Sequence, residues 1–114
     1  DWGRAGRERE TLAVERTLAD ADEAAFRAQL ARTTRPDLAA MDRLARTVAV
    51  DDSIIALRAA VLREATARYR EAAITAAEYA TREAELLAAR LAQTAHRVEL
   101  ARARVSYLTT LGLE

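Results

Sequence analysis

Apolar side chains recur at seven-residue intervals through the middle of the chain. The repeat consists of Met41, Val48, Ile55, Leu62 and Tyr69, and it is widened by Leu44, Ile54, Leu57 and Val61. Such a heptad pattern is typical of a helix that packs along its length against another helix. It predicts one unbroken helix from near Leu38 to Tyr69, about 45–50 Å long, that runs through the polar segment 50–53.

The last third of the chain carries two apolar stripes. The first, here called the Leu87 stripe, consists of Leu87, Leu91, Val98, Ala101, Val105 and Leu108. The second, the Tyr79 stripe, consists of Tyr79, Leu86, Leu100 and Tyr107, in heptad register through Gln93. Successive residues of a coiled coil are about 103° apart, so the two stripes lie on well-separated faces. A helix with two apolar faces requires packing neighbours on both sides.

Between these segments the sequence predicts a reversal of the chain. Thr75 and Glu78 have the spacing of a capping box, with Ile74 and Tyr79 at the staple positions around it. A new helix is therefore expected from Ala76 to about residue 111, after a turn within residues 70–75. Its end is predicted by Gly112 at the C′ position, with Leu108 and Leu113 in the apolar contact of a Schellman motif.

The first third is also predicted to be helical, with a looser stripe formed by Leu12, Leu18, Ala21, Ala25, Phe26 and Leu30. Pro36 interrupts it. Either Thr33 or Thr34 caps a fresh helix, or one helix over residues 4–70 continues with a kink near 34–36. The outgoing helix would span about 100 Å against about 55 Å for the return, which leaves the first stripe uncovered unless another segment or subunit packs there.

These patterns predict an all-α fold. Residues 1–114 are expected to form a single long antiparallel helical hairpin, resembling a coiled coil, whose outgoing helix is kinked or broken near Pro36. Aromatic residues make up only 4% of the 114 residues, and Ala supplies much of the apolar fraction. That composition favours closely approaching helices over a wide globular core.

Charge and composition argue against several classes of function. The 18 basic residues are all Arg and interleave with 18 acidic ones, whereas nucleic-acid binding needs positive charge gathered on one face. The chain has no Cys, and no stretch is as long and apolar as a membrane-spanning helix. The opening Asp1-Trp2-Gly3-Arg4 indicates a piece of a longer reading frame.

No residues suggest catalysis or a cofactor. His96 is the one histidine, and Glu99 three residues later is placed to hydrogen-bond it, but no metal-binding motif surrounds them. Asp51 and Asp52 are expected on a solvated helix face. Since the sequence holds no recognisable set of nucleophile, base and orienting group, it predicts a protein that is not an enzyme and has no cofactor.

Three segments, in order, resemble the outer membrane efflux protein (TolC-like) family across essentially the whole chain. Asp1-Trp2-Gly3-Arg4 is similar to the entry to a long helix after that family's last barrel strand. Segment 67–76, Ala-Arg-Tyr-Arg-Glu-Ala-Ala-Ile-Thr-Ala, resembles the periplasmic hairpin tip, although Ala72 stands where the family has Gly. The closing segment 98–108 and Leu111-Gly112 look like the return helix and its end. Because Ala is costly in a left-handed turn, this departure predicts a wider reversal or an overrunning helix.

The resemblance implies a periplasmic segment of a trimeric outer-membrane duct that exports small molecules with an inner-membrane pump. It also implies a homotrimer in the full-length protein and a periplasmic adaptor protein docked at the tip. The residues implied for docking are Arg68, Tyr69, Arg70, Glu71, Ala72, Ala73, Ile74 and Thr75. Arg68, Arg70 and Glu71 are candidates for ion pairs that close the entrance, with solvated charges beside a turn as the alternative. Trp2 is expected to anchor the strand–helix junction.

A second interpretation stays open at this stage. A periplasmic adaptor's own coiled-coil hairpin is built from the same heptads and would have a structural function without a channel. Its two arms have similar lengths, however, whereas the arms predicted here are unequal.

Overall fold

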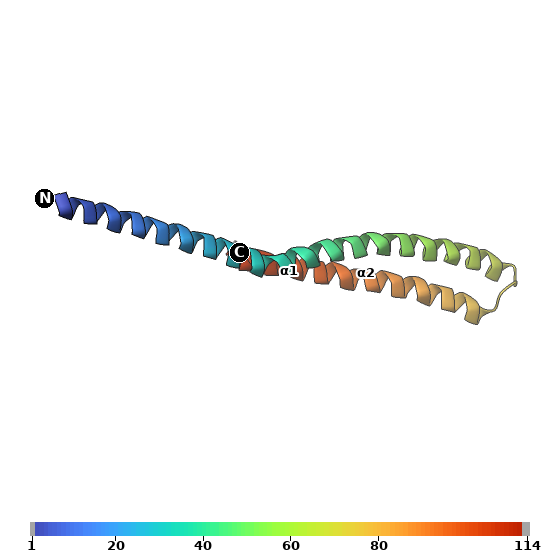
Figure 1. The fold of residues 1–114 in the computed structure, drawn as a ribbon. Helices are drawn as coiled ribbons and strands as arrows, with labels where there is room; N and C mark the ends of the chain where they lie inside the picture. The colour runs from blue at the N-terminus through green and yellow to red at the C-terminus, as the bar shows by residue number, and fades with distance from the viewer. Residues whose placement is uncertain (1, 113–114) are drawn as a thin grey trace. The chain divides into compact units, whose positions relative to one another are not determined.

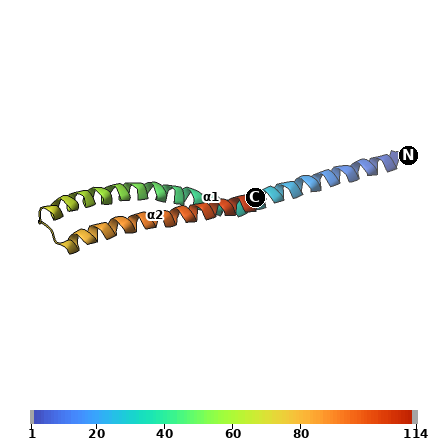
Figure 2. The same ribbon diagram turned by 180° about the vertical axis from the view of Figure 1, so that it is seen from behind.

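The computed structural model describes residues 2–112, which form two helices joined by a short turn. Helix α1 runs from Trp2–Arg70 and helix α2 from Ala76–Thr110. Residues 71–75 connect them, and the second part of α1 lies antiparallel beside α2 in both ribbon views (Figure 1 and Figure 2). The predicted all-α helical hairpin is confirmed.

The chain divides into two units at Pro36, the residue that interrupts the sequence pattern. The N-terminal unit comprises residues 1–36, and the C-terminal unit comprises residues 37–114. The C-terminal unit is the hairpin: it contains the second part of α1, the turn and α2. In the N-terminal unit, the described residues are entirely helical.

The helical conformation of α1 continues through Pro36. The alternative of a fresh helix capped by Thr33 or Thr34 is therefore wrong. Both hydroxyls instead donate back within the helix, Thr33 to the carbonyl of Gln29 at 2.8 Å and Thr34 to that of Leu30 at 2.9 Å. A helix can include proline when neighbouring groups satisfy its backbone, although the missing N–H and the ring clash destabilise it.

The hairpin is packed along the heptad positions of both helices. Leu44 and Ala65 of α1 and Leu86 and Leu100 of α2 are buried. Of the other heptad residues on α1, Tyr69 is exposed and the remaining four are half-buried: Met41, Val48, Ile55 and Leu62. The Tyr79 stripe therefore faces α1. Four small or medium-sized buried side chains make a narrow contact, as the low aromatic content led us to expect.

The Leu87 stripe lies on the opposite side of α2 and is open. Its larger side chains remain between 43% and 61% exposed, with Leu91 the most exposed. Part of α1 is open too, since Val50 and Leu57 are 57% and 63% exposed. The predicted separation of the two stripes onto different faces is confirmed, and only one of those faces has a neighbour within the hairpin.

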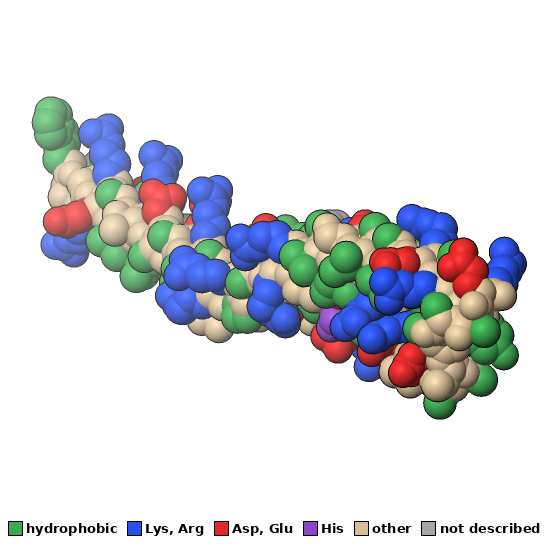
Figure 3. Space-filling view, turned by 90° about the vertical axis from the view of Figure 1, so that its right-hand side faces the viewer, with side chains coloured by type: hydrophobic (Ala, Val, Ile, Leu, Met, Phe, Trp, Pro, Cys, Tyr) green, Lys and Arg blue, Asp and Glu red, His purple; other side chains and the backbone are tan. Residues whose placement is uncertain are grey.

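The N-terminal unit exposes its own apolar side chains. Leu12, Leu18 and Phe26 are each about 60–70% exposed, and Trp2 is almost fully exposed. In the space-filling view, apolar side chains lie among Arg and acidic side chains along the face that is visible (Figure 3). Neither described helix contains a segment whose length and apolar character would allow it to cross a membrane.

Both ends of α2 follow from local chemistry. Thr75 is the N-cap, and its capping box with Glu78 is complete, as predicted. At the other end, Gly112 has a φ of +72° and its N–H donates to the carbonyl of Thr109 at 3.0 Å. This bond is one of the two that define a Schellman motif. The expected contact with Leu113 lies outside the described residues.

Candidate docking site at the hairpin tip

The end of α1 is a complete Schellman motif. The Ala73 N–H donates to the carbonyl of Arg68 at 2.8 Å, and the Ala72 N–H donates to that of Tyr69 at 3.0 Å. These are the two bonds that satisfy the last carbonyls of a helix and turn the chain away from its axis. The reversal within residues 71–75 is therefore tight, and the Schellman hydrogen bonds satisfy the last carbonyls of α1.

Ala72 adopts the left-handed conformation on which this motif depends. Its φ is +58°, and it is the one residue other than glycine with a positive φ among residues 2–112. The expectation that Ala at this position would widen the turn or let α1 overrun it is wrong. The hydrogen bonds of the motif keep the geometry, so the strain of about 1–2 kcal/mol stays in Ala72.

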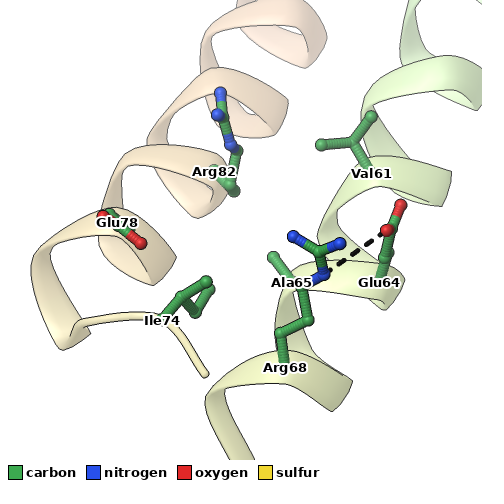
Figure 4. Close-up of a pocket in the computed structure, with 7 residues that line it drawn as sticks. All are labelled: Val61, Glu64, Ala65, Arg68, Ile74, Glu78 and Arg82. Carbon is green, nitrogen blue, oxygen red and sulfur yellow. Dashed lines mark ion pairs between the residues drawn. The ribbon is translucent and has the colours of Figure 1, made fainter. Parts of the chain in front are cut away.

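A groove lies between the helices beside the turn. It has a volume of about 370 Å³ and is drawn in Figure 4. Its lining has an apolar part, formed by Val61, Ala65 and Ile74. The rest is charged: two acidic side chains, Glu64 and Glu78, and two basic ones, Arg68 and Arg82. The groove therefore offers both an apolar surface and charged groups of either sign to whatever contacts the tip.

Two aromatic rings stack between the helices at the tip of the hairpin. Tyr69 and Tyr79 are stacked with ring centroids 5.0 Å apart and planes at 8°. Tyr69 is 43% exposed even so. This contact ties the last turn of α1 to the first turn of α2, in agreement with the interpretation of Tyr69 as a packing residue.

The charged residues of the tip make only local contacts. Arg68 pairs with Glu64 on its own helix at 3.5 Å, and both side chains are well exposed. No ion pair involves Arg70 or Glu71 anywhere in residues 2–112. The interpretation of these two as solvated charges matches a single copy of the chain, and their pairing with another subunit stays a prediction. Exposed pairs such as Arg68–Glu64 contribute little stability.

A polar cluster that sequence reasoning missed lies in the middle of the hairpin. Asp51 is buried, and its Oδ2 lies 2.6 Å from His96 Nδ1. Beside them, the buried Gln93 amide donates to the Val48 carbonyl at 3.1 Å and to Asp52 Oδ1 at 2.7 Å. The single histidine, purple in Figure 3, reaches the surface beside acidic side chains. The expectation of a solvated Asp51 is wrong, because α2 covers it.

The same cluster corrects the expected partner of His96. No hydrogen bond joins its ring to Glu99 in the described part of the chain; the ring contacts Asp51 of α1 instead. One signal could have identified this. Leu44, Asp51, Arg58 and Ala65 follow one another at seven-residue intervals. Asp51 and Arg58 therefore lie on the same face of α1 as the buried Leu44 and Ala65, which is the face that packs on α2.

Arg58 forms a further bridge between the helices. Its guanidinium lies 3.1 Å from Glu85 Oε2, and Arg82 contacts the same carboxylate from α2 at 3.0 Å. Closer to the C-terminal end of α2, Ser106 donates to Asp37 at 3.2 Å. These contacts fix the antiparallel register at three levels, together with the Asp51–His96 cluster between them.

The described residues were compared with the requirements of a metal site and with known proteins. Nowhere in residues 2–112 do three or more His, Cys, Asp or Glu side chains gather in a way that could hold a metal ion. Comparison with protein-family models, with curated proteins and with solved structures finds no match. The arrangement of residues is therefore the only ground for a function.

Proposed function

We propose that this chain is the periplasmic helical segment of a trimeric outer-membrane duct that exports small molecules. In this proposal the hairpin forms part of the tunnel wall, and its tip docks on a periplasmic adaptor protein that is driven by an inner-membrane pump. The chain itself supplies surfaces and no chemistry.

The observation that carries the proposal is the second apolar face of α2. A wall built of helices needs each helix to contact a neighbour on two sides, because the wall is only one helix thick. One face of α2 is packed on α1, while Leu91 and Val105 of the other face are about 60% exposed. Contiguous apolar surface of this kind marks a site of interaction.

The tip adds a second argument. Segment 67–76 resembles the family's hairpin tip, and the complete Schellman motif and capping box hold it in one conformation. The groove lined by Ile74, Arg68 and Arg82 is a suitable surface for a helix of the adaptor. The residues proposed for this contact are those of the tip, Arg68 to Thr75.

The test uses the full-length reading frame that contains this chain, expressed in bacteria that lack their own outer-membrane efflux duct. Leu91→Glu places a charge on the open face of α2 and is expected to abolish trimers in the membrane and efflux of a fluorescent substrate. Ala92→Glu places the same charge on the neighbouring exposed residue, outside the Leu87 stripe and at the heptad position of Glu85 and Ser106, and is expected to keep both activities.

The proposal fails if the unaltered full-length protein neither forms trimers nor restores efflux. It also fails if Leu91→Glu and Ala92→Glu behave alike. A lipoyl-like domain split around the hairpin in the full-length sequence would favour the adaptor interpretation instead.

A further inference from the structure

The Leu87 stripe extends along the whole of α2. Its heptad pattern is completed by Ala77, Ala80, Ala84 and Thr94, which are all exposed. No charged residue occupies any position of this pattern between residues 77 and 108. The face that packs on α1 is more polar, since it includes Arg82, Gln93 and His96. The open face is therefore better suited to burial than the buried one, which indicates a helical partner.

The charged residues that flank this stripe are basic except for Glu83. Arg90, Arg97 and Arg104 follow one side at seven-residue intervals, and Arg102 lies on the other side. None of the four makes an ion pair within residues 2–112. Two copies of α2 paired through their Leu87 stripes would set Arg against Arg, which argues against that arrangement. The partner helix needs acidic flanks.

A stripe with acidic flanks exists in the N-terminal unit. This Val14 stripe consists of Thr11, Val14, Leu18, Ala21, Ala25 and Ala28, all exposed. Glu8, Glu15 and Asp22 follow one side at seven-residue intervals, and Glu10 lies on the other side. Only Glu8 of these four is ion-paired among the described residues, with Arg4 at 3.7 Å. Its charge pattern is thus the complement of the one on α2.

One parallel register pairs the flanking charges and sets residues 98–108 beside residues 11–21, while Arg4 and Arg7 of the same heptad lie opposite Leu91 and Thr94. In a parallel coiled coil, the residue just before the first apolar position of a heptad (position g) lies near a flanking residue of the partner helix. That partner residue stands five places further along the aligned sequence (position e). Aligning Val98 with Thr11 places Val105 beside Leu18 and Ala101 beside Val14. The same alignment pairs four Arg with four acids: Arg90 with Glu8, Arg97 with Glu15, Arg104 with Asp22, and Arg102 with Glu10.

We propose that the Leu87 stripe of one copy binds the Val14 stripe of a second copy as a parallel coiled coil. The inference concerns how copies of this chain associate and does not rest on the proposed duct. Because each copy carries both stripes, two copies can pair reciprocally or each can bind a further copy. Association is expected to rise with concentration, and to weaken with salt because exposed ion pairs flank the contact.

The test is complementation between two charge-reversed chains, followed by sedimentation velocity. The acidic variant is Arg90→Glu/Arg97→Glu/Arg104→Glu, and the basic variant is Glu8→Arg/Glu15→Arg/Asp22→Arg. Each variant carries like charges on both stripes, so its self-association should weaken at least about tenfold. Mixing the two should restore association, because each stripe then meets its opposite in the other variant.

The control reverses three exposed Arg away from both stripes, Arg16→Glu/Arg43→Glu/Arg63→Glu, and should associate as the unaltered chain does. Circular dichroism checks that every variant stays helical. The proposal is overturned if the unaltered chain stays monomeric at several hundred micromolar. It is also overturned if the basic variant still self-associates, since its unchanged α2 would then be pairing elsewhere, or if the mixture fails to associate.

The register has its own test. A chain with Leu18→Cys mixed with a chain with Val105→Cys should form mixed disulfides between copies under mild oxidation. Leu18→Cys mixed with Leu91→Cys should form far fewer, because these positions lie two heptads apart in the proposed alignment. Equal yields for the two mixtures would rule out the register.

Discussion

The reversal of the chain depends on the left-handed conformation of Ala72. A left-handed conformation costs an L-amino acid with a Cβ about 1–2 kcal/mol, and glycine avoids that cost. At Ala72 the conformation is held by the two Schellman hydrogen bonds, which Ala72 and Ala73 donate to carbonyls of α1. The local chemistry of the turn thus overrides the preference of its central residue.

Ala72→Gly is expected to stabilise the hairpin by about 1 kcal/mol, because relief of the steric cost outweighs the added freedom of glycine in the unfolded chain. Urea unfolding monitored by circular dichroism measures the effect. Ala88→Gly, at an exposed position inside α2, is the matched control and should destabilise by about 1 kcal/mol. A destabilising Ala72→Gly would contradict the left-handed conformation.

At the scale of the helices, the buried polar cluster sets how α1 and α2 align. An apolar heptad can slide by seven residues and repack, whereas Asp51 and His96 meet in only one register. Gln93 adds a second restraint through the Val48 carbonyl and Asp52. At these positions polar contacts replace apolar packing between α1 and α2, and the two helices gain a defined alignment.

Removing one partner of this cluster should cost more than removing both. Asp51→Ala is expected to destabilise the hairpin by about 1–2 kcal/mol, because it leaves the half-buried His96 ring without its acceptor. The double variant Asp51→Leu/His96→Leu is expected to be near neutral or more stable, since apolar side chains pack in place of the pair. Chemical denaturation compares the two. A double variant less stable than Asp51→Ala would contradict the role assigned to the pair.

The sequence was sufficient for the helices and insufficient for the polar contacts between them. Thr75, Glu78 and the heptads act locally, so the start of α2 and the separation of its two stripes could be predicted. Asp51 could not be placed by looking for apolar residues, because its burial depends on which face α2 covers. Ala72 was misjudged for a similar reason, since its conformation is set by the hydrogen bonds that Ala72 and Ala73 donate to the last turn of α1.

At the scale of the whole chain, apolar surface is left open in both units. The N-terminal unit exposes Leu18 and Phe26, and the hairpin exposes the Leu87 stripe. Both the proposed duct and the proposed pairing of copies depend on that distribution. These open stripes are the apolar surfaces that the fold presents to other molecules.

The central claim is that α2 packs on α1 with the Tyr79 stripe and leaves the Leu87 stripe open. Its most direct test is disulfide formation within single chains, at concentrations low enough to avoid association. Leu44→Cys with Leu100→Cys joins two buried positions on facing helices and should crosslink readily, whereas Leu44→Cys with Val98→Cys, on the open stripe, should not. Efficient crosslinking of the second pair, or none of the first, would contradict the account.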